Sequence, residues 1–257
     1  MLTFKEYLGE FIGTFILVLF GCGSVAVAVL YGGFGSLLEV AIVWGLGVAI
    51  AIFVTRNICP AHLNPAVSVA MCISKQLTVK KLPVYILSQT LGAFAAGGFL
   101  YLIFSSGISI YEATNGIIRG SEDSIQSAMM FGEYFPNPSF ANKLEVTPFL
   151  ACIMEGFGTF VLVFVILRLT EKKEQIDNLV PVLIGLTVTL IICLVAPSTQ
   201  AGLNPARDFG PRLVAYFAGW DSAAFPSASF SFLTVYIISP VLGGVIAAYF
   251  NRFLMRK

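Results

Sequence analysis

The tetrapeptide Leu63-Asn-Pro-Ala66 occurs a second time as Leu203-Asn-Pro-Ala206, and this pair decides the fold. Each copy leads into a short apolar stretch, Ala66–Ile73 in the first case and Ala206–Phe217 in the second. Asparagine followed by proline is a typical helix start, because Asn caps the first turn and Pro lacks only an N–H that this turn does not use. Neither stretch is long enough to cross a bilayer, so each predicts a re-entrant half-helix buried in protein.

Six longer apolar runs surround the two motifs. Each approaches the roughly 20 residues that a helix needs to cross a bilayer. The 257-residue chain is 57% hydrophobic and 11% charged, whereas soluble domains carry about 25% charged residues. We therefore predict an all-α membrane protein with six transmembrane helices and two re-entrant half-helices. The predicted spans are Tyr7–Leu30, Leu38–Thr55, Leu82–Phe104, Pro148–Leu169, Leu179–Val195 and Phe232–Phe253.

The composition also argues against several classes of function. The five cysteines show no zinc-type spacing, and His62 is the single histidine, so we predict no metal site and no cofactor. No nucleophile–base pair points to an enzyme, and no basic cluster points to a nucleic-acid partner. The expected surroundings are the lipid bilayer.

The two halves of the chain resemble each other beyond the paired motifs. Glu10-Phe-Ile-Gly-Thr-Phe15 recurs as Glu155-Gly-Phe-Gly-Thr-Phe160, and Val84-Tyr-Ile recurs as Val235-Tyr-Ile, in the same order. Each half holds three spans, so the copies lie inverted in the membrane, an arrangement that places the site near the midplane. We predict one channel domain, 1–257, with repeats at about 1–105 and 147–257 and a long extracellular loop, 106–146.

Inversion brings the N-termini of the two half-helices together at the midplane. Their positive dipole ends then repel cations and protons from a pore that passes between them. The Asn64 and Asn204 amides are each expected to donate a hydrogen bond into the lumen, which orients a passing oxygen and interrupts proton hopping. Backbone carbonyls of the extended segments before each motif are expected to line the pore. Backbone that is not helical is tolerated at this depth only where it lines a water-filled cavity or is buried in protein. The residues concerned are Pro60, Ala61, His62, Gln200 and Gly202.

Basic residues predict the orientation of the chain. They gather before the first span, between the second and third, after the fourth and after the sixth, whereas the long loop 106–146 is mainly acidic. By the positive-inside rule, both termini are cytoplasmic.

With these paired motifs and inverted repeats, the chain resembles the major intrinsic proteins, the aquaporin and aquaglyceroporin family, over essentially its whole length. The segment Asn204-Pro-Ala-Arg-Asp-Phe-Gly-Pro-Arg212 is similar to the glycerol-facilitator members of the aquaglyceroporin branch, in which an aspartate, here Asp208, follows the motif arginine. The resemblance implies a passive channel for glycerol, water and other small uncharged solutes that excludes protons and ions. It also implies a homotetramer in the plasma or inner membrane, with the pore centre formed by Asn64, Pro65, Ala66, Asn204, Pro205 and Ala206.

The resemblance assigns a selectivity filter to Trp44, Ile192, Ala201 and Arg207. Trp44 and Arg207 agree with the glycerol branch, but a glycine and a phenylalanine are usual at the other two positions. The set Trp, Ile, Ala, Arg is similar to the filter of plant nodulin-type members of the family. This departure leaves open a pore that conducts mainly water, or one for urea, ammonia or neutral metalloid hydroxides.

Two carboxylates lie inside predicted spans, where charged residues are functional candidates. Glu10 and Glu155 could couple transport to protons or ions, as in a secondary transporter. The resemblance implies instead that each accepts hydrogen bonds from the backbone of a re-entrant segment, and that Asp208 braces loops. The glycines of the third and sixth predicted spans, among them Gly98, are expected to allow close helix contacts.

Overall fold

The computed structural model describes residues 4–171, 177–225 and 231–255, and within these ranges it contains helices and loops but no strand. Six helices are long and apolar enough to cross a membrane, which confirms the predicted all-α membrane architecture. These spans are α1 (Phe4–Tyr31), α2 (Leu37–Thr55), α4 (Leu82–Thr114), α6 (Pro148–Glu171), α8 (Val180–Thr199), and a last span made of α10 (Ser231–Leu233), the π-helical turn η6 (Thr234–Ile238) and α11 (Ser239–Leu254).

The two half-helices begin at the prolines of the paired motifs. They are α3 (Pro65–Ile73) and α9 (Pro205–Ala215). The remaining described elements are short: η1 (Val79–Lys81), η2 (Glu122–Ser124), α5 (Ile125–Ala128), η3 (Pro138–Phe140), the π-helical turn η4 (Tyr216–Trp220) and η5 (Asp221–Ala224).

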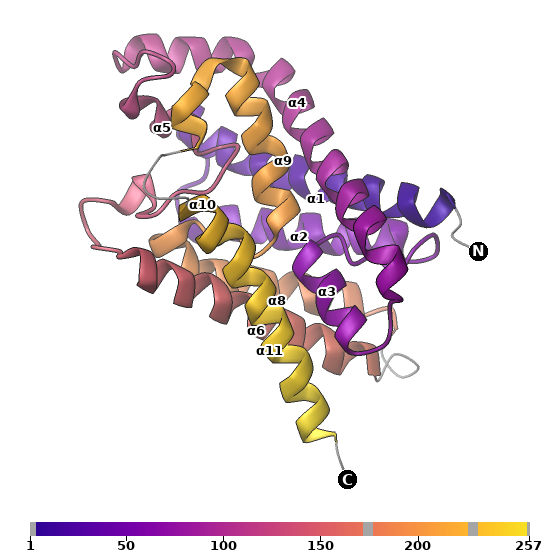
Figure 1. The fold of residues 1–257 in the computed structure, drawn as a ribbon. Helices are drawn as coiled ribbons and strands as arrows, with labels where there is room; N and C mark the ends of the chain where they lie inside the picture. The colour runs from indigo at the N-terminus through magenta and orange to yellow at the C-terminus, as the bar shows by residue number, and fades with distance from the viewer. Residues whose placement is uncertain (1–3, 172–176, 226–230, 256–257) are drawn as a thin grey trace.

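The long helices surround the half-helices in two matching sets (Figure 1). In the first half α1 packs against α2 and α4, and in the second half α6 packs against α8 and α11. The half-helices cross between the halves: α3 packs against α11, and α9 packs against α4. Each half-helix is therefore held by the last long helix of the opposite half.

The predicted boundaries are wrong at several places: α1 begins at Phe4 rather than Tyr7, and α8 ends at Thr199 rather than Val195. Helix α4 continues ten residues beyond the predicted end at Phe104, because residues 105–114 contain no proline and the first left-handed glycine, Gly116, comes only after them. The N–H of Ile117 then closes the helix end on the carbonyl of Glu112. Half-helix α9 ends at Ala215 rather than Phe217, and the chain passes into a π-helical turn that contains the left-handed Gly219.

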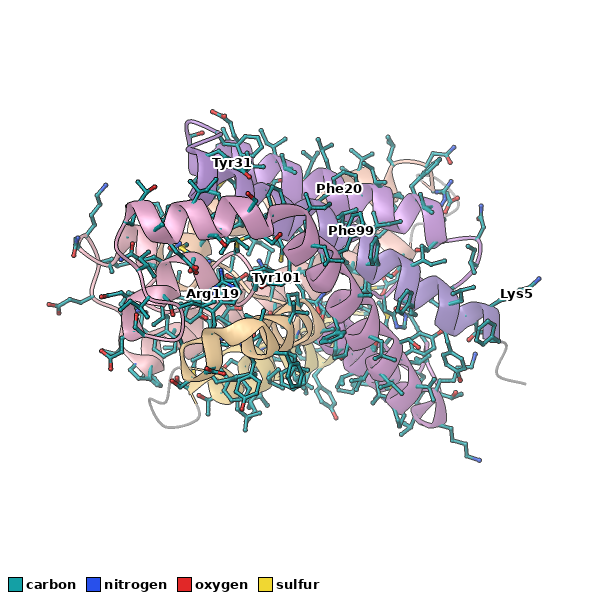
Figure 2. The ribbon with its side chains drawn as sticks, turned by 90° about the horizontal axis from the view of Figure 1, so that it is seen from above. Lys5, Phe20, Tyr31, Phe99, Tyr101 and Arg119 are labelled. Atoms are coloured by element: carbon teal, nitrogen blue, oxygen red, sulfur yellow. The ribbon has the colours of Figure 1, made fainter. Side chains whose placement is uncertain are left out.

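The outer surface of the helices is apolar. Figure 2 shows Phe20, Tyr31 and Phe99 along α1 and α4, and each of these side chains is exposed. Large exposed apolar side chains also occur along α2, α6, α8 and α11. A surface of this kind is stable when lipid rather than water covers it.

Helices α2 and α8 cross at a pair of glycines. A Cβ on Gly185 would lie 2.3 Å from the carbonyl oxygen of Gly45, and a Cβ on Gly45 would lie 2.5 Å from that of Gly185. The related crossings use Gly92 against Phe11 and Gly243 against Gly156. The expectation of a close contact is wrong for Gly98, where a Cβ would meet no atom of this chain within 4 Å.

Replacement of Gly185 by alanine is therefore expected to lower the free energy of unfolding by about 1–3 kcal/mol, because the two helices must separate to admit the methyl group. The midpoint of thermal unfolding of the purified protein in detergent measures this effect. Gly98→Ala is the matched control, since it adds the same methyl group to open space. Equal midpoints for the two variants would contradict the steric explanation.

Candidate functional site

The two motif asparagines cap the half-helices. Asn64 and Asn204 have extended backbones, and the side-chain oxygen of each accepts a hydrogen bond from the N–H two residues later, at 2.8 Å from Ala66 and 3.1 Å from Ala206. The Asn204 oxygen also accepts from the N–H of Arg207 at 3.3 Å. Both half-helices therefore begin at the asparagines with capped, positive dipole ends.

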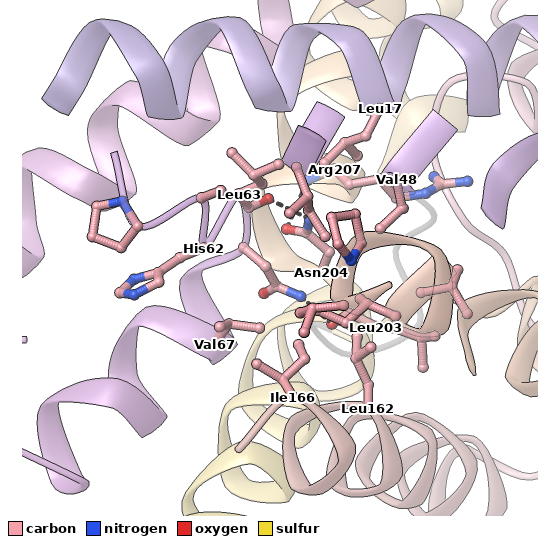
Figure 3. Close-up of a pocket in the computed structure, with 18 of the residues that line it drawn as sticks. Leu17, Val48, His62, Leu63, Val67, Leu162, Ile166, Leu203, Asn204 and Arg207 are labelled. Atoms are coloured by element: carbon pink, nitrogen blue, oxygen red, sulfur yellow. Dashed lines mark hydrogen bonds between the residues drawn. The ribbon is translucent and has the colours of Figure 1, made fainter. Parts of the chain in front are cut away.

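The asparagine amides connect the two halves directly. Nδ2 of Asn64 donates to the carbonyl of Leu203 at 2.9 Å, and Nδ2 of Asn204 donates to the carbonyl of Leu63 at 2.8 Å. Figure 3 shows the bond between Leu63 and Asn204. A primary amide carries two N–H groups, so each asparagine uses one to tie the halves together and keeps one more donor. Both asparagines line the central cavity.

Glu10 and Glu155 hold the backbone of the re-entrant segments. Glu10 accepts hydrogen bonds from the N–H groups of His62 and Leu63 at 2.9 and 2.7 Å. Glu155 accepts from those of Gly202 and Leu203 at 2.9 and 2.7 Å, and from the Thr199 hydroxyl at 2.6 Å. Both carboxylates are fully buried. The four carboxylate oxygens thus accept hydrogen bonds from backbone N–H groups that lie outside any helix.

Matching backbone conformations produce this arrangement in both halves. Ala61 and Leu63 in the first segment, and Ala201 and Leu203 in the second, have positive φ values between 52° and 62°. Left-handed backbone is strained for residues other than glycine, and it persists where surrounding bonds fix it. The N–H groups turn toward the glutamates, while the carbonyls of Ala61 and Ala201 accept no hydrogen bond in the part of the chain that the structure describes.

One cavity of about 360 Å³ joins the four filter residues, the two asparagines and the end of the molecule that carries Arg56. Of the sequence-predicted residues, Trp44, Ile192, Ala201 and Arg207 line it, as do Pro60, Ala61, His62 and Gly202. Figure 3 shows apolar side chains on opposite sides, Leu162 and Ile166 across from Leu17 and Val48, with Asn204 between them. Gln200, Pro65, Ala66, Pro205 and Ala206 are not among the residues that line it.

The residues of the predicted filter include a cation that lies against an aromatic ring. The guanidinium carbon of Arg207 lies 4.2 Å from the centre of the Trp44 ring, and both side chains are buried. Gly21 makes room for Trp44, because a Cβ there would lie 2.1 Å from the ring. A solute that enters meets hydrogen-bond donors on one wall and an apolar ring on another.

Asp208 and Gln200 connect the second re-entrant region to the long loop between α4 and α6, the predicted outer loop. Asp208 accepts a hydrogen bond from the N–H of Glu133 at 2.7 Å and pairs with Arg212 at 2.7 Å. The Gln200 side chain accepts from the N–H of Tyr134 at 2.9 Å and donates to the carbonyl of Met129 at 3.1 Å. These bonds fold the loop over the filter.

The same architecture occurs in a known family. The family model described as "Major intrinsic protein" matches residues 1–251. The chain belongs to the major intrinsic protein family.

Named relatives of this major intrinsic protein are similar along nearly their whole length. A glycerol uptake facilitator protein of Pseudomonas aeruginosa is 38% identical, over 99% of this chain and 90% of its own. A propanediol uptake facilitator of Citrobacter freundii is 33% identical, over 98% and 92%. The X-ray structure of the aquaglyceroporin from Plasmodium falciparum superposes with a TM-score of 0.83 at 27% identity, covering 98% of this chain and 96% of that one.

A second charged group, the Glu133 carboxylate, lies at the predicted filter of this major intrinsic protein and could not be predicted from the sequence. Glu133, from the outer loop, forms an ion pair with Nη1 of Arg207, and its carboxylate is buried. Burial raises the pKa of the Glu133 carboxyl to about 8, against the opposing effect of the Arg207 guanidinium. The sequence shows only one acid among several in this loop, so nothing in it singles out Glu133.

Glycerol permeability is expected to fall about twofold to tenfold as the pH on the outer-loop side rises through about 8. Below that pH the carboxyl is neutral and Arg207 is free to donate to solute, whereas above it the carboxylate holds one guanidinium donor. Stopped-flow measurements on oriented vesicles between pH 6.5 and 9.5 test this dependence. Glu133→Gln should be independent of pH over the same range, and a variant that keeps the full dependence would exclude Glu133 as its source.

The end of the cavity that carries Arg56 is also built from two segments. Arg56, at the end of α2, donates from Nη1 to the carbonyl of Asp177 and from Nη2 to Oδ1 of Asn178, both at 3.0 Å. Arg56 and Asp177 both line the cavity. The residues just before α8 are therefore bonded to the end of α2 at this end of the cavity.

Proposed function

We propose that this chain is a passive channel that conducts glycerol, water and other small uncharged solutes and excludes protons and ions. The observation that carries the proposal is the single cavity that passes from the Trp44–Arg207 filter to the two motif asparagines. A polyol is matched by donors on one wall and apolar surface on the other, whereas an ion loses hydration that this wall does not replace. The named glycerol and propanediol facilitators support this solute class.

A coupled transporter is less well supported than a channel. Coupling at Glu10 or Glu155 requires a carboxylate that can release its partners, but both accept backbone hydrogen bonds that hold the re-entrant segments. The family and the named uptake facilitators support a role in solute transport.

Stopped-flow light scattering on proteoliposomes tests the function. Gradients of water, glycerol, urea and arsenite rank the solutes, and parallel runs with protonophore or sodium ionophore test coupling. Glycerol flux that persists without any ion gradient is the expected result. Uptake that requires a proton or sodium gradient would reject the channel, and flux of water alone would reject glycerol as the main solute.

The charge distribution also bears on the location and orientation of the protein in the cell. We infer a multi-pass protein of the plasma or inner membrane with both termini cytoplasmic, because the basic residues gather on that side. We also infer a homotetramer with one pore in each subunit, on the strength of membership of the family alone. Sedimentation of the detergent-solubilised protein measures the number of subunits.

Replacement of Trp44 by alanine is expected to admit polyols larger than glycerol, because the ring forms one wall of the narrow region beside Arg207. Permeability to a four- or five-carbon polyol should rise at least tenfold relative to glycerol, on the scale of the few kcal/mol that a pocket contact discriminates. Trp44→Phe keeps an aromatic wall and serves as the control. An unaltered size cutoff in Trp44→Ala would remove Trp44 as a wall.

A further inference from the structure

A cluster of polar and aromatic side chains outside the channel cavity joins three segments of the chain. Glu112 comes from the end of α4, Arg119 and Ser127 from the loop between α4 and α6, and Trp220 from the turn after α9. We call these four residues the tryptophan cluster. None of the four lines the channel cavity, so any effect of the cluster on a solute must act through other residues.

The Glu112 carboxylate fixes the polar part of the tryptophan cluster. It accepts hydrogen bonds from Nη2 and Nε of Arg119 at 2.8 and 3.0 Å, and from the Ser127 hydroxyl at 2.7 Å. The Ser127 oxygen in turn accepts from Nε1 of Trp220 at 2.9 Å. Glu112 is 6% exposed and Trp220 is fully buried. Separation of these groups would leave a buried charge unpaired, so the cluster holds its three segments together firmly.

The ring of Trp220 carries the contact on to the loop between α4 and α6. The guanidinium carbon of Arg119 lies 4.3 Å from the centre of this ring. The ring of Phe131 lies 5.4 Å from it, centre to centre, and that of Tyr101 6.0 Å. Nη1 of Arg119 donates to the Tyr101 hydroxyl at 3.2 Å (Figure 2). Cations and rings attract each other at these distances. Trp220 therefore holds Phe131, which is fully buried and precedes Glu133 by two residues.

The residues after Phe131 complete the path to the predicted filter. Gly132 lies tightly against Arg212, because a Cβ on this glycine would stand 2.8 Å from Cζ of the arginine. Arg212 donates to the carbonyl of Glu133, and the N–H of Glu133 donates to Asp208 at 2.7 Å. The Glu133 carboxylate then pairs with Arg207. The contacts are thus continuous from the tryptophan cluster to the filter cation.

We propose that the tryptophan cluster positions the Glu133 carboxylate against Arg207, and thereby sets how many guanidinium donors the predicted filter offers to a solute. Trp220 is a positioning residue in this scheme, since it acts through Phe131 and Glu133. The inference rests on the proposed function, because the donors matter only to a filter that passes hydroxyl-bearing solutes. Variants at both ends of the path measure whether the two ends are coupled.

Glycerol permeability of proteoliposomes, with the same buffer on both sides at pH 6.5 or 9.5, tests the inference. This range spans the pKa of about 8 of the Glu133 carboxyl. In the unaltered protein the permeability at pH 6.5 should exceed that at pH 9.5 about twofold to tenfold, since the carboxylate occupies a donor at high pH. In Trp220→Leu the carboxylate leaves Arg207, so the permeability at pH 9.5 should rise and the ratio should fall to about one. General damage to the fold would instead lower permeability at both pH values.

Two further variants show whether the Trp220 ring itself is responsible. Trp220→Phe keeps a ring against Arg119 and Phe131 and should restore most of the pH dependence. Phe164→Leu is the matched control, because it removes a ring that packs on Phe250 at 5.5 Å, centre to centre, between α6 and α11. This control should keep the pH dependence of the unaltered protein. A loss of pH dependence in Phe164→Leu equal to that in Trp220→Leu would overturn the proposal.

A double variant tests whether Trp220 acts through Glu133. Trp220→Leu combined with Glu133→Gln should conduct as Glu133→Gln does alone, because the group to be positioned is already gone. Glu133→Gln also separates the titration of this carboxyl from that of its neighbours. The other titratable groups around the carboxyl are Cys22 of α1, Glu155 of α6, Arg207, Asp208 and Arg212 of α9, the adjacent Tyr134, and Tyr236 of the last span.

Several results would overturn the proposal. These are a Trp220→Leu variant that keeps the full pH dependence, and a double variant that conducts at least twofold less than Glu133→Gln alone. If Trp220→Leu does not fold, Glu112→Gln decides, because it removes the charge that pairs with Arg119 and should lower the ratio. An unaltered protein whose glycerol flux is independent of pH would overturn the positioning role and leave the channel standing. Glycerol uptake that requires an ion gradient would reject the channel itself.

Discussion

Replacement of Arg207 by valine is expected to increase proton flux through the channel at least tenfold. Arg207 is the cation of the predicted filter, and its guanidinium carbon lies 4.2 Å from the centre of the Trp44 ring. A unit positive charge repels a cation at contact distance by about 1 kcal/mol in water and by about 4 kcal/mol near a protein surface, where the effective dielectric constant is lower. Valine removes that barrier and leaves the carboxyl of Glu133 without its partner.

Proteoliposomes loaded with a pH-sensitive dye measure the flux after an external pH step. Arg56→Val is the matched control, because Arg56 lines the same cavity at its inner mouth but lies outside the filter. At neutral pH the double variant Arg207→Val with Glu133→Gln should leak as much as Arg207→Val alone, because without Arg207 the pKa of the buried Glu133 carboxyl rises further and the group is already uncharged. Proton flux that stays at the level of the unaltered protein in Arg207→Val would show that the half-helix dipoles alone exclude protons.

Replacement of Glu155 by leucine is expected to prevent the second re-entrant segment from folding and to abolish solute flux. The carboxylate accepts hydrogen bonds from the backbone of Gly202 and Leu203 and from Thr199, and all these groups are buried. Leucine offers no acceptor, and each buried N–H left without one costs about 1–3 kcal/mol. The loss is therefore several kcal/mol, comparable with the stability of a typical domain.

The amount of folded protein that survives mild heating in detergent, together with glycerol flux, measures this effect. Glu155→Gln keeps one acceptor oxygen and should retain intermediate stability and flux that is independent of any ion gradient. If Glu155→Leu folds normally and only loses dependence on a proton gradient, the carboxylate is a coupling group rather than a support for backbone. Glu10→Leu should behave alike, since Glu10 holds His62 and Leu63 in the first half.

The repeat made much of the fold predictable. The Asn-Pro order predicts the start of a helix from local chemistry alone, and α3 and α9 begin at Pro65 and Pro205. The six apolar runs predict spans because bilayer thickness sets helix length. The end of α4 was not predictable from hydropathy, since residues 105–114 are mixed in character and the end depends on Asn115 and Gly116.

The parts of the site that sequence did not predict depend on contacts between distant segments. Glu133 precedes Arg207 by 74 residues and reaches it only because Asp208 and Gln200 fold the outer loop over the filter. Likewise, the motif spacing shows that Asn64 and Asn204 cap helices, but it does not show that each amide also donates to a carbonyl of the other half. Such hydrogen bonds between distant parts of one chain depend on how the chain packs and cannot be predicted from a local sequence pattern.

The exchange of half-helices between the two halves bears on how the chain is made. As the ribosome releases the first half, α3 has neither α11 to pack against nor the carbonyl of Leu203 to receive the Asn64 amide. Until the second half is inserted, the Asn64 amide lacks its acceptor and α3 lacks its helix partner near the middle of the bilayer, where water is scarce. The pore centre can therefore reach its final packing only after the second half has been inserted.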